Sequence, residues 1–492
     1  MKIAVFNSHT LLASHYETEL EIIINHLNAG DSVVQIVCDK DLPACDTNPF
    51  HLPEACERCV SKRKNGLQQL GLNVKAVNFF NLTVSDKQRI QAVPKKHPSI
   101  ADLQKLVVDN YEVGFAISSS LISYYRNANP DLDQKLIERY IVGCLGVYFS
   151  MINYLKAHPT DVVYAFNGRL SHTKAVLQAC KTMGVLCRLH ERGNSLNYYS
   201  IFDNTSIHDL KNTQKLIDES WAKAPAETKV DRATKWFTTR IGGKMENWYS
   251  FLENQVHELP SEWDESKNNV ILCTSSEDEF ASLGDEWKNH LYASQTDGIF
   301  KIIESVKAID NLHLYIRIHP HLAKVDNDDL RRLIQAKGDN LTIIPAQSQL
   351  STYTLVKHGT RVITFGSTIG MESTFLRKPS ILAGKAFYFG MNGTYDPKSH
   401  DELIALLAAE LDPKPLEIAL KFGYFFGTFG IPFEHYKPED FGKGKIKGVS
   451  LEPTDGLKFK AINWLYHNKK FSALSEKLRL RDREKNLQRY LP

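Results

Sequence analysis

The segment 365–373, FGSTIGMES, places three small residues where an apolar strand is expected to lead into a helix. Gly366, Ser367 and Thr368 would leave the first backbone N–H groups of that helix open to a phosphate, and two of them add hydroxyl donors. Glu372 follows at a spacing from which it could reach the hydroxyls of an attached ribose. Helix capping and helix–sheet packing explain the same residues, so this segment alone leaves both interpretations open.

A second polar group follows the expected strand LHLYI, in the stretch RIHPHL at 317–322. His319 could donate a hydrogen bond to a phosphate oxygen or protonate a departing phosphate, and Pro320 fixes the turn that presents it. Arg317 lies on the same strand face and could add a positive charge. A histidine at a strand end is also a common structural group. The two motifs together favour one binding site, because both follow neighbouring strands of one expected domain.

Alternating strands and helices are predicted to position these residues, a pattern typical of parallel sheets with crossover helices. In the N-terminal part, KIAVFN and SVVQIVC flank one helix, and DVVYAFNG and VLCRLHERG flank another. The segment between these two groups, 97–158, has apolar residues at helical spacing. After a connecting region at 220–268, strands and helices alternate again from NNVILC to PSILAG.

We therefore predict an α/β protein with two Rossmann-like domains built on parallel sheets, the layout called GT-B, and a C-terminal helical tail. The expected N-terminal domain, residues 1–255, includes a cysteine-rich loop and a helical insertion. The expected second domain is 256–430 and the tail is 431–492. In this layout ligands are expected at the carboxyl ends of the strands, in the cleft between the domains.

The composition limits the class of protein. With 492 residues, 42% of them hydrophobic, the chain is long enough for two or three domains. A net charge of +3 gives no overall electrostatic reason to expect binding to nucleic acid. The N-terminus MKIAVFNSH fits a first β-strand and is too short in its apolar part for a signal peptide, which predicts a cytoplasmic protein. The apolar segment 141–155 is shorter than the ~20 residues of a membrane span, so a buried helix is expected.

Four cysteines crowd into the segment 38–59, at the expected end of the second strand: Cys38, Cys45, Cys56 and Cys59. Four thiolates at this density could hold a structural zinc ion or an iron–sulfur cluster. Their spacing matches no standard zinc finger, and buried thiols or a redox pair are the alternatives. Such a metal would stabilise the loop and take no part in catalysis.

The C-terminal segment 469–492 carries a local excess of positive charge and places Phe471, Leu474 and Leu478 on one helical stripe. A helix of this kind could hold the protein on an anionic membrane leaflet. The alternative is a solvated helix that packs back on the first domain.

These motifs, taken together, resemble those of a known family. The stretches RIHPHL and FGSTIGMESTFLRKPSI resemble the HP motif and the Ser/Thr-rich motif of bacterial capsule and surface-polysaccharide glycosyltransferases. The stretches FNGR at 166–169 and HERG at 190–193 also resemble first-domain signatures of capsule and O-antigen enzymes. The resemblance thus involves both expected domains.

The resemblance implies a transferase that moves a sugar from a CMP-, CDP- or UDP-linked donor to a growing cell-surface polysaccharide or a lipid-linked glycan. It implies that His319 with Gly366, Ser367 and Thr368 holds the donor phosphate, and that Glu372 meets the ribose or base. Transfer in this family generally requires no metal ion, because protein groups stabilise the departing nucleotide. Such an enzyme would lie in the cytoplasm, with a peripheral contact at the inner membrane face as an option for the basic tail.

A third expected strand exit carries CTSSEDE. Ser275, Ser276, Glu277 and Glu279 could line the donor site, and a solvated acidic loop is the alternative.

The acceptor side of such a reaction needs a group that takes the proton of the acceptor hydroxyl. Glu191 is the predicted base, with His190 behind it, because HERG follows an expected strand. An ion pair of Glu191 with Arg192 or Arg169 is the structural alternative. Asn167 and Arg169 are predicted to position the acceptor, with Arg169 against an anionic sugar.

Three other functions stay open at this point. A nucleotide-sugar epimerase on the same plan would convert its substrate without an acceptor. A metal-stabilised nucleic-acid-binding protein would need a basic stripe beside the cysteines, and only SKRK at 61–64 is a candidate for it. A scaffold in a polysaccharide assembly complex would tolerate alanine at His319.

Overall fold

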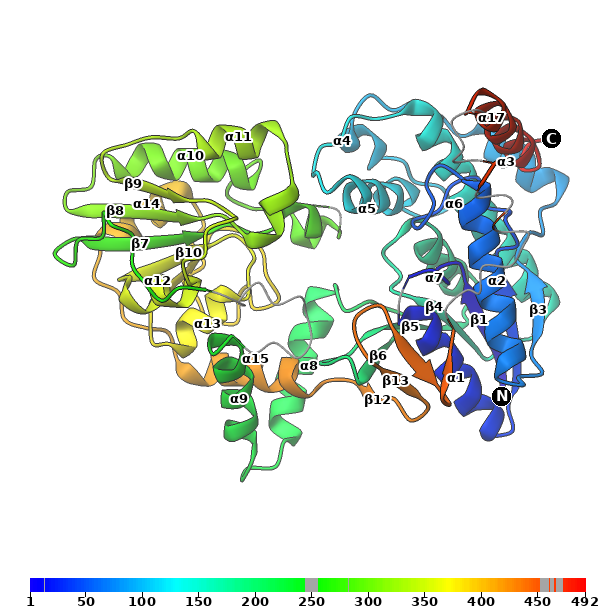
Figure 1. The fold of residues 1–492 in the computed structure, drawn as a ribbon, viewed down its shortest axis with the longest axis horizontal. Helices are drawn as coiled ribbons and strands as arrows, with labels where there is room; N and C mark the ends of the chain where they lie inside the picture. The colour runs from blue at the N-terminus through cyan, green and yellow to red at the C-terminus, as the bar shows by residue number, and fades with distance from the viewer. Residues whose placement is uncertain (13, 244–254, 282, 452–459, 461–463, 466–471) are drawn as a thin grey trace. The chain divides into compact units, whose positions relative to one another are not determined.

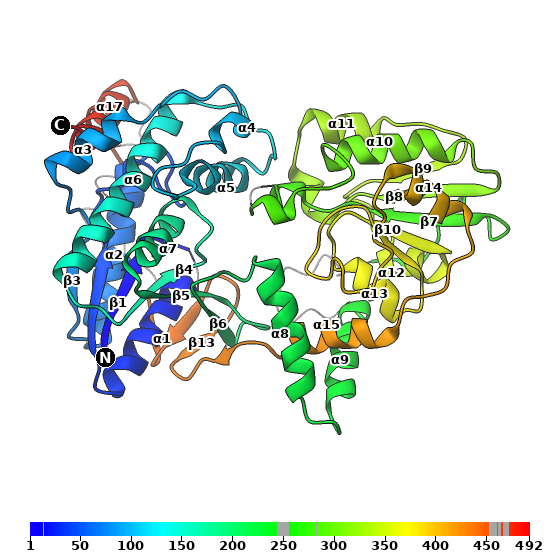
Figure 2. The ribbon, with the colours of Figure 1, turned by 180° about the vertical axis from the view of Figure 1, so that it is seen from behind.

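The chain forms two compact units in the computed structural model (Figure 1). The structure describes residues 1–492 except 13, 244–254, 282, 452–459, 461–463 and 466–471. The first unit consists of Met1–Tyr125, Asn129–Ile207 and Gly430–Pro492, and the second of Arg126–Ala128 and His208–Phe429. Figure 2 shows the same ribbon from behind, with helices on both faces of each main sheet.

The first unit is built on a sheet in the order β12-β6-β5-β4-β1-β2-β3. Five neighbouring strands are parallel: β1 (Lys2–Asn7), β2 (Ser32–Val37), β3 (Lys75–Asn78), β4 (Val162–Phe166) and β5 (Leu186–Arg192). Two antiparallel strands extend the β5 edge: β6 (Tyr198–Asp203) and β12 (Ile431–Pro432). The parallel strands therefore lie in the order 3-2-1-4-5, which is that of a Rossmann-like sheet, with its switch point between β1 and β4.

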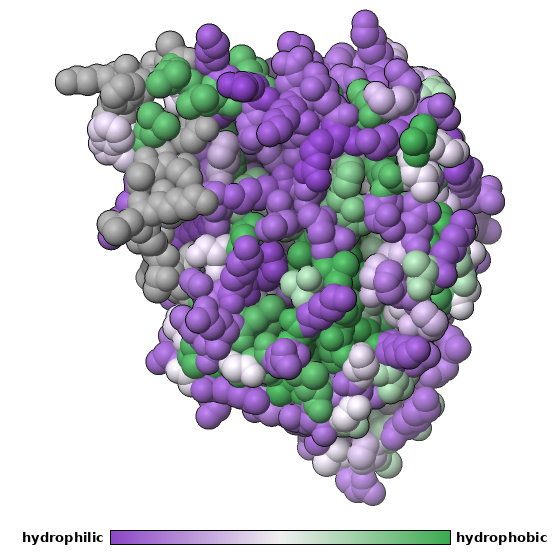
Figure 3. Space-filling model, turned by 90° about the vertical axis from the view of Figure 1, so that its right-hand side faces the viewer, coloured by the Kyte–Doolittle hydropathy of each residue, from purple (hydrophilic) through white to green (hydrophobic). Residues whose placement is uncertain are grey.

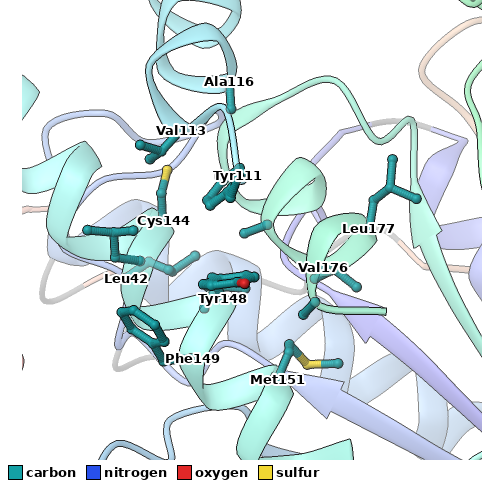
Figure 4. Close-up of a cluster of buried hydrophobic side chains, with 14 of the residues drawn as sticks. Leu42, Tyr111, Val113, Ala116, Cys144, Tyr148, Phe149, Met151, Val176 and Leu177 are labelled. Atoms are coloured by element: carbon teal, nitrogen blue, oxygen red, sulfur yellow. The ribbon is translucent and has the colours of Figure 1, made fainter. Parts of the chain in front are cut away.

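Alternate side chains of β1 enter two different cores, as the pleat of a strand requires. Ala4 and Phe6 pack with α3 (Val84–Ala92), α5 (Val113–Tyr125), α6 (Gln134–Ala157) and α7 (Ser171–Met183). The short helix α4 (Ile100–Leu103) leads into α5. Figure 4 shows part of this core, with Tyr148 and Met151 of α6 beside Val176 of α7.

The other face of the first sheet receives Ile3 and Val5 of β1. They pack with α1 (His15–Asn28), α2 (Pro53–Gln69) and a small sheet of β13 (Tyr436–Pro438), β14 (Gly444–Ile446) and β15 (Val449–Ser450). Glu21 of α1 fixes this small sheet, because its buried carboxylate accepts hydrogen bonds from the backbone N–H groups of residues 434–436. The C-terminal part of the chain thus completes the first unit.

The second unit has a fully parallel sheet in the order β11-β10-β7-β8-β9. Its strands are β7 (Asn268–Cys273), β8 (Leu312–Arg317), β9 (Leu341–Ile344), β10 (Arg361–Thr364) and β11 (Ser380–Leu382). Counted from β7, this is again the order 3-2-1-4-5, and the switch point lies between β7 and β10. The predicted fold class, α/β with two Rossmann-like sheets, is confirmed.

Helices cover both faces of the second sheet. One face packs on α10 (Gln295–Val306), α11 (Asp328–Ile334) and α14 (His400–Ala408). The other face packs on α12 (Thr352–His358) and α13 (Ile369–Phe375). A third core joins α13 to α8 (Leu210–Lys223), α9 (Lys229–Ile241) and α15 (Leu416–Thr428).

The boundaries of the units differ from the expected domains 1–255, 256–430 and 431–492. Helices α8 and α9 belong to the second unit, because Ile217 and Phe237 are buried against Phe422 of α15. The expected tail belongs to the first unit. Its last helix, α17 (Ser472–Gln488), packs on the loop between β2 and α2 through Arg483 and Asn486 and on the first turn of α2 through Arg479.

The second interpretation of the basic tail, packing against the first domain, is therefore correct for α17. Of the predicted stripe, Leu474 is exposed and Phe471 lies outside the described residues. No helix in the described part of the chain is both long and apolar enough to cross a bilayer. On the face shown in Figure 3, hydrophobic side chains gather in the lower half, with hydrophilic side chains around them.

Candidate functional site

The loops that leave β7, β8 and β10 meet at the switch point of the second sheet. His319, after β8, donates its backbone N–H to the Thr274 hydroxyl in the loop after β7, at 2.9 Å. Gly366, after β10, lies against Phe280 of that same loop, since a Cβ at Gly366 would stand 3.4 Å from the Phe280 ring. The structure thus brings the three predicted donor motifs together at one edge of one sheet.

Two serine hydroxyls at this edge have no hydrogen-bond partner among the described residues. Ser275 and Ser276 are 4% and 2% exposed, and neither Oγ reaches another polar atom of that part of the chain. Gln295 holds the loop, because its side chain bonds the backbone N–H and C=O of Ser275 at 2.7 and 3.0 Å. An unpaired buried hydroxyl is costly, so a ligand that supplies the partner would be bound favourably.

The two predicted acidic residues of this loop differ in their surroundings. Glu277 accepts a hydrogen bond from the backbone N–H of Gln295 at 2.9 Å and so ties the loop to the start of α10. Burial raises the pKa of Glu277 above its usual value. Glu279 is more exposed and lies 3.6 Å from Nδ1 of His321. Glu277 is therefore a structural group in this structure, whereas Glu279 borders the open side of the loop.

His319 is held in one orientation and is neutral near pH 7. Its Nδ1 accepts a hydrogen bond from the backbone N–H of His321 at 3.2 Å. Burial, together with the neighbouring His321, lowers the pKa of His319 to about 4. In a neutral ring whose Nδ1 accepts, the proton is on Nε2. His319 is therefore suited to donate one hydrogen bond to a ligand, and less suited to act as a resident cation.

The prediction that Arg317 supplies charge to this site is wrong. Arg317 is 2% exposed, and its two terminal nitrogens donate to the backbone carbonyls of Pro345 and Ser348, at 2.5 and 3.0 Å. Burial lowers its pKa. The strand alternation that puts Arg317 on the face of His319 also carries its long side chain into the core, where it holds the loop after β9.

Both carboxylate oxygens of Glu372 accept hydrogen bonds from protein groups. Neither oxygen is therefore free for the predicted contact with a ribose. Its Oε1 accepts from Arg240 Nε at 2.8 Å and from the Thr368 hydroxyl at 2.9 Å, and its Oε2 accepts from Tyr353 at 2.7 Å. The side chain is 3% exposed. Arg240 also donates to the Thr368 hydroxyl at 3.1 Å. Glu372 therefore positions Arg240 and Thr368.

Arg240 is a candidate site residue that the sequence did not reveal. It lies at the end of α9, in a segment expected to be a connection, and its side chain is 20% exposed. Burial lowers its pKa, but the Glu372 carboxylate raises it, and the net shift is upward. The guanidinium is therefore a permanent positive charge beside Thr368.

Several backbone N–H groups at the N-terminus of α13, which were expected to be available to a phosphate, already donate within the chain. The backbone N–H of Ser367 donates to the Thr364 hydroxyl, and that of Ile369 donates to the Ser367 hydroxyl. The N–H groups of Gly370 and Met371 are also bonded within the chain. A phosphate would therefore contact the hydroxyls of this segment more readily than its amides. Gly366 keeps its role in close packing, since a Cβ there would stand 2.9 Å from the Lys385 carbonyl oxygen.

The exits of β4 and β5 bring the predicted acceptor residues together. Asn167 and Gly168 adopt φ angles of 57° and 78°, which Asn and Gly tolerate best, and so reverse the chain directly after β4. The turn points Asn167 at Glu191, whose Oε2 accepts from its side-chain amide at 2.6 Å. Arg169 donates to Ser119 and Ser123 of α5, both at 3.2 Å.

Glu191 accepts hydrogen bonds from the side-chain amide of Asn167 at 2.6 Å and from the backbone N–H of Arg192 at 2.9 Å, and its Oε1 lies 3.8 Å from Nε2 of His15. Its carboxylate stays 19% exposed. His190, the preceding residue of β5, is fully buried. Burial lowers the pKa of His190 to about 4, and neither ring nitrogen has a hydrogen-bond partner in the described part of the chain.

A polar network around β1 was missed by the sequence analysis. His9 Nε2 lies 2.9 Å from Asp46 Oδ2, and His9 Nδ1 lies 2.8 Å from the Ser8 hydroxyl. Glu19 accepts from the amide of Asn7 at 2.6 Å. The stretch NSH after the first strand was the available signal, because polar residues directly follow a strand at the sheet centre. Asp46 gave no signal, since it lies among the cysteines.

The predicted zinc or iron–sulfur site is not assembled. Cys38, Cys45, Cys56 and Cys59 are free, half-buried thiols, and no three His, Cys, Asp or Glu side chains of the described residues are placed to hold a metal ion. Burial raises the pKa of all four thiols, that of Cys45 to about 12. Protonated thiols are poor metal ligands and poor nucleophiles. The alternative of simple buried thiols fits this structure.

Comparisons with known proteins give structural likeness at low sequence identity. No family model matches the chain, and no curated protein matches it. Among solved structures, the beta Kdo 2,4 transferase KpsC of Thermosulfurimonas dismutans is 16% identical, with 54% of this chain and 79% of that chain covered and a TM-score of 0.38. The spinosyn rhamnosyltransferase SpnG, complexed with spinosyn aglycone, is 11% identical, with 86% and 96% covered and a TM-score of 0.28.

A UDP-GlcNAc 2-epimerase from Neisseria meningitidis, bound to UDP-GlcNAc, is 12% identical, with 85% of this chain and 97% of that chain covered and a TM-score of 0.27. The similar structures thus include transferases and an epimerase. The assignment of two Rossmann-like sheets rests on the strand orders of this chain itself.

Proposed function

We propose that the protein is a glycosyltransferase that binds a nucleotide-activated sugar at the carboxyl edge of the second sheet and extends a cell-surface polysaccharide, of the capsule or O-antigen type. One observation carries the proposal: the buried hydroxyls of Ser275 and Ser276 lack partners among the described residues, at the switch point where His319 also lies. Parallel sheets of this order bind ligands at that point.

The donor phosphate is proposed to accept hydrogen bonds from Nε2–H of His319 and from the hydroxyl of Ser367, whereas the Thr368 hydroxyl donates to Glu372. Arg240 adds a positive charge that Glu372 holds beside Thr368. Fixed donors aimed at the departing phosphate stabilise the charge that develops when the bond to the sugar breaks. We propose on this basis that transfer proceeds without a metal ion, and chelation with EDTA is expected to leave the rate unchanged.

The acceptor is proposed to be a glycan or a lipid-linked glycan that binds the first unit near Asn167, Arg169 and Glu191. Arg169 would meet an anionic sugar, since its guanidinium reaches this edge of the sheet and is steadied by two serines. The enzyme would act in the cytoplasm, in peripheral contact with the inner membrane face, and would have no nucleic-acid partner. The net charge of +3 supports the last point.

The test is thermal stabilisation by CMP, CDP, UDP, GDP and dTDP. A nucleotide that binds the folded state stabilises it by about 2.7 kcal/mol at 100 times its Kd, so one nucleotide is expected to stand out. His319→Ala and the double variant S275A/S276A are expected to weaken its binding at least tenfold. His158→Ala, at an exposed position after α6, is the matched control. Stabilisation by none of the five nucleotides would contradict the proposal.

Product analysis separates the transferase from the epimerase. The nucleotide sugar whose base stands out in the first test is incubated with the protein alone and then with a glycan acceptor. Acceptor-dependent release of the nucleotide is expected. Conversion of the nucleotide sugar to an isomer without an acceptor would assign the epimerase instead.

A further inference from the structure

Three polar side chains form a connected line at the switch point of the first sheet. Ser8 and His9 follow β1, and Asp46 comes from the loop after β2. The Ser8 hydroxyl lies 2.8 Å from His9 Nδ1, and His9 Nε2 lies 2.9 Å from Asp46 Oδ2. Ser8 is 5% exposed and His9 1% exposed, so a ligand hydroxyl at this edge would meet Ser8 before the ring.

The direction of the hydrogen bonds follows from the chemistry of the three groups. Burial opposes ionisation of Asp46, but its hydrogen bond with His9 helps to hold its pKa at about 2, so Asp46 is a carboxylate that only accepts. His9 Nε2 must then donate to it. In the neutral ring Nδ1 becomes the acceptor, and the Ser8 hydroxyl donates to it. The line therefore runs from Ser8 through His9 to a buried negative charge.

The loop that carries Asp46 holds it firmly in place. The Ser171 hydroxyl, at the start of α7, donates to Asp46 Oδ1 at 3.1 Å. Asn48, two residues on, caps the approach to α2 through the backbone N–H of Leu52 at 2.8 Å. A second imidazole, His172, lies nearby and also helps to keep the pKa of Asp46 low. Such fixation is what an orienting carboxylate requires.

Several buried side-chain nitrogens around this line lack hydrogen-bond partners among the described residues, which is unusual for a purely structural core. Buried nitrogens of His15, His172 and His190 lack hydrogen-bond partners within the described residues. Native cores leave few such groups, and those that persist are found at functional sites. Glu191 is less suited than His9 to take a proton, because both of its oxygens already accept hydrogen bonds from Asn167 and Arg192.

We propose that Ser8 and His9 form a proton relay that deprotonates the acceptor hydroxyl, with Asp46 as the positioning residue of His9. The inference rests on the proposed transferase function. The acceptor O–H bond breaks and its proton passes to Ser8 Oγ, while the Ser8 proton passes to His9 Nδ1. The freed electron pair of the acceptor oxygen bonds the anomeric carbon. The bond from that carbon to the donor phosphate breaks, and the nucleotide leaves with its electron pair. Asp46 then stabilises the imidazolium.

The first experiment measures transfer with the nucleotide sugar and glycan acceptor identified for the wild-type protein. His9→Gln is expected to lower kcat by about 100-fold or more, the usual range for loss of a positioned base, with unchanged Kd for the nucleotide. Ser8→Ala and Asp46→Asn are expected to lower kcat in the same way. Ser118→Ala, another buried serine of the first unit, is the matched control. A wild-type kcat for His9→Gln or Ser8→Ala would overturn the relay.

The second experiment requires no substrate. In the full chain labelled with ¹⁵N-histidine, NMR at pH 8.5 is expected to show His9 as the Nε2–H tautomer. Asp46→Asn is expected to convert it toward the Nδ1–H tautomer, because an amide can donate to Nε2, whereas Asp161→Asn should change nothing. An Nδ1–H ring in the wild type overturns the relay. If the wild type turns over no nucleotide sugar, the proposed transferase function fails. The His9 tautomer then tests separately whether the hydrogen bonds of Ser8, His9 and Asp46 run in the proposed direction.

Discussion

Glu19 of α1 is a carboxyl group that the fold keeps protonated at neutral pH. It is 1% exposed, and burial raises its pKa to about 8, although the Asn7 amide opposes this by donating to it. His190 Nε2 lies 3.8 Å from Glu19 Oε1 and is itself neutral. The polar network around β1 therefore contains a neutral acid beside neutral imidazoles, with Asp46 as a fixed charge. Its hydrogen bonds depend on this distribution of protons.

The Glu19 pKa predicts how stability changes with pH. The pKa of Glu19 is higher in the folded than in the unfolded protein. The contribution of protonated Glu19 to the free energy of unfolding is therefore fully present below about pH 4.5 and is lost as the pH rises through 8. Glu19→Gln imitates the protonated form and removes this loss. The variant is expected to match the wild type near pH 4.5 and to be more stable at pH 8, in urea denaturation. An exposed control, Glu417→Gln, should track the wild type at both pH values. A variant that is less stable than the wild type at pH 8 would contradict the assignment.

Glu372 offers a second prediction, which separates a ligand contact from a structural role. Its replacement by Gln leaves Arg240 buried beside a neutral partner, and breaking a buried pair in this way typically costs about 3–5 kcal/mol. Chemical denaturation of Glu372→Gln is expected to show a loss of this order. A variant of wild-type stability that no longer binds the nucleotide would instead support the ribose contact.

At the residue scale, sequence spacing predicted which residues lie close together better than it predicted their hydrogen-bond partners. His319, Ser275 and Gly366 meet as predicted because strand exits of one parallel sheet share an edge. Arg317 and Glu372 differ from their predicted roles because their partners are distant in sequence. Arg240 reaches Glu372 from 132 residues away, and no local pattern encodes that approach.

At the element scale, α17 and the residues directly after it hold the C-terminal part of the chain on the first unit. Arg489 pairs with Asp41, and the Tyr490 hydroxyl donates to the Asp41 carbonyl at 3.0 Å. Tyr490 is fully buried, and a Cβ at Gly146 of α6 would stand 2.2 Å from its ring. The C-terminus therefore closes the core over the loop that carries Asp46. The basic residues that suggested a membrane contact include several that serve this packing.

Tyr490→Ala tests the role of this closure. Removing a fully buried aromatic side chain typically costs about 3–5 kcal/mol, and the loss is expected in chemical denaturation of the full chain. Arg481→Ala, on the exposed side of α17, is the control and should change stability by less than about 0.5 kcal/mol. Equal stability of the two variants would mean that α17 does not close the core in solution.

The strands were predictable because each is a short apolar run between turn residues. VVYAF of β4 and LHLYIR of β8 are buried along their whole length, as central parallel strands must be. Helices α2 and α9 were not predicted, since α2 begins among the cysteines and α9 has a polar composition. The burial of α9 depends on residues such as Phe237, which packs on α15, nearly two hundred residues later in the chain. The predicted domain boundary at residue 255 therefore lies too late in the chain, because the main segment of the second unit begins at His208.

At the scale of the whole molecule, the same strand order occurs twice, with different chemistry at each switch point. The first sheet ends in imidazoles and carboxyl groups, and the second ends in hydroxyls with a neutral histidine. This difference fits the proposed reaction, in which groups of the first unit accept a proton and groups of the second unit bind an anion. Proton transfer needs titratable groups of tuned pKa, whereas phosphate binding needs fixed donors.

The difference between the two units predicts where a nucleotide will slow amide hydrogen exchange. Binding stabilises the unit that binds by mass action, and amides that exchange through opening of that unit gain the same protection. The nucleotide selected by thermal stabilisation is expected to slow exchange in β7, β8 and β10, with little change in β1 and β2. His319→Ala should abolish the protection, and Ser8→Ala should preserve it, because Ser8 and His319 share no hydrogen-bond partner among the described residues. Protection confined to the first unit would place the nucleotide on the other sheet and contradict the assignment of donor and acceptor sides.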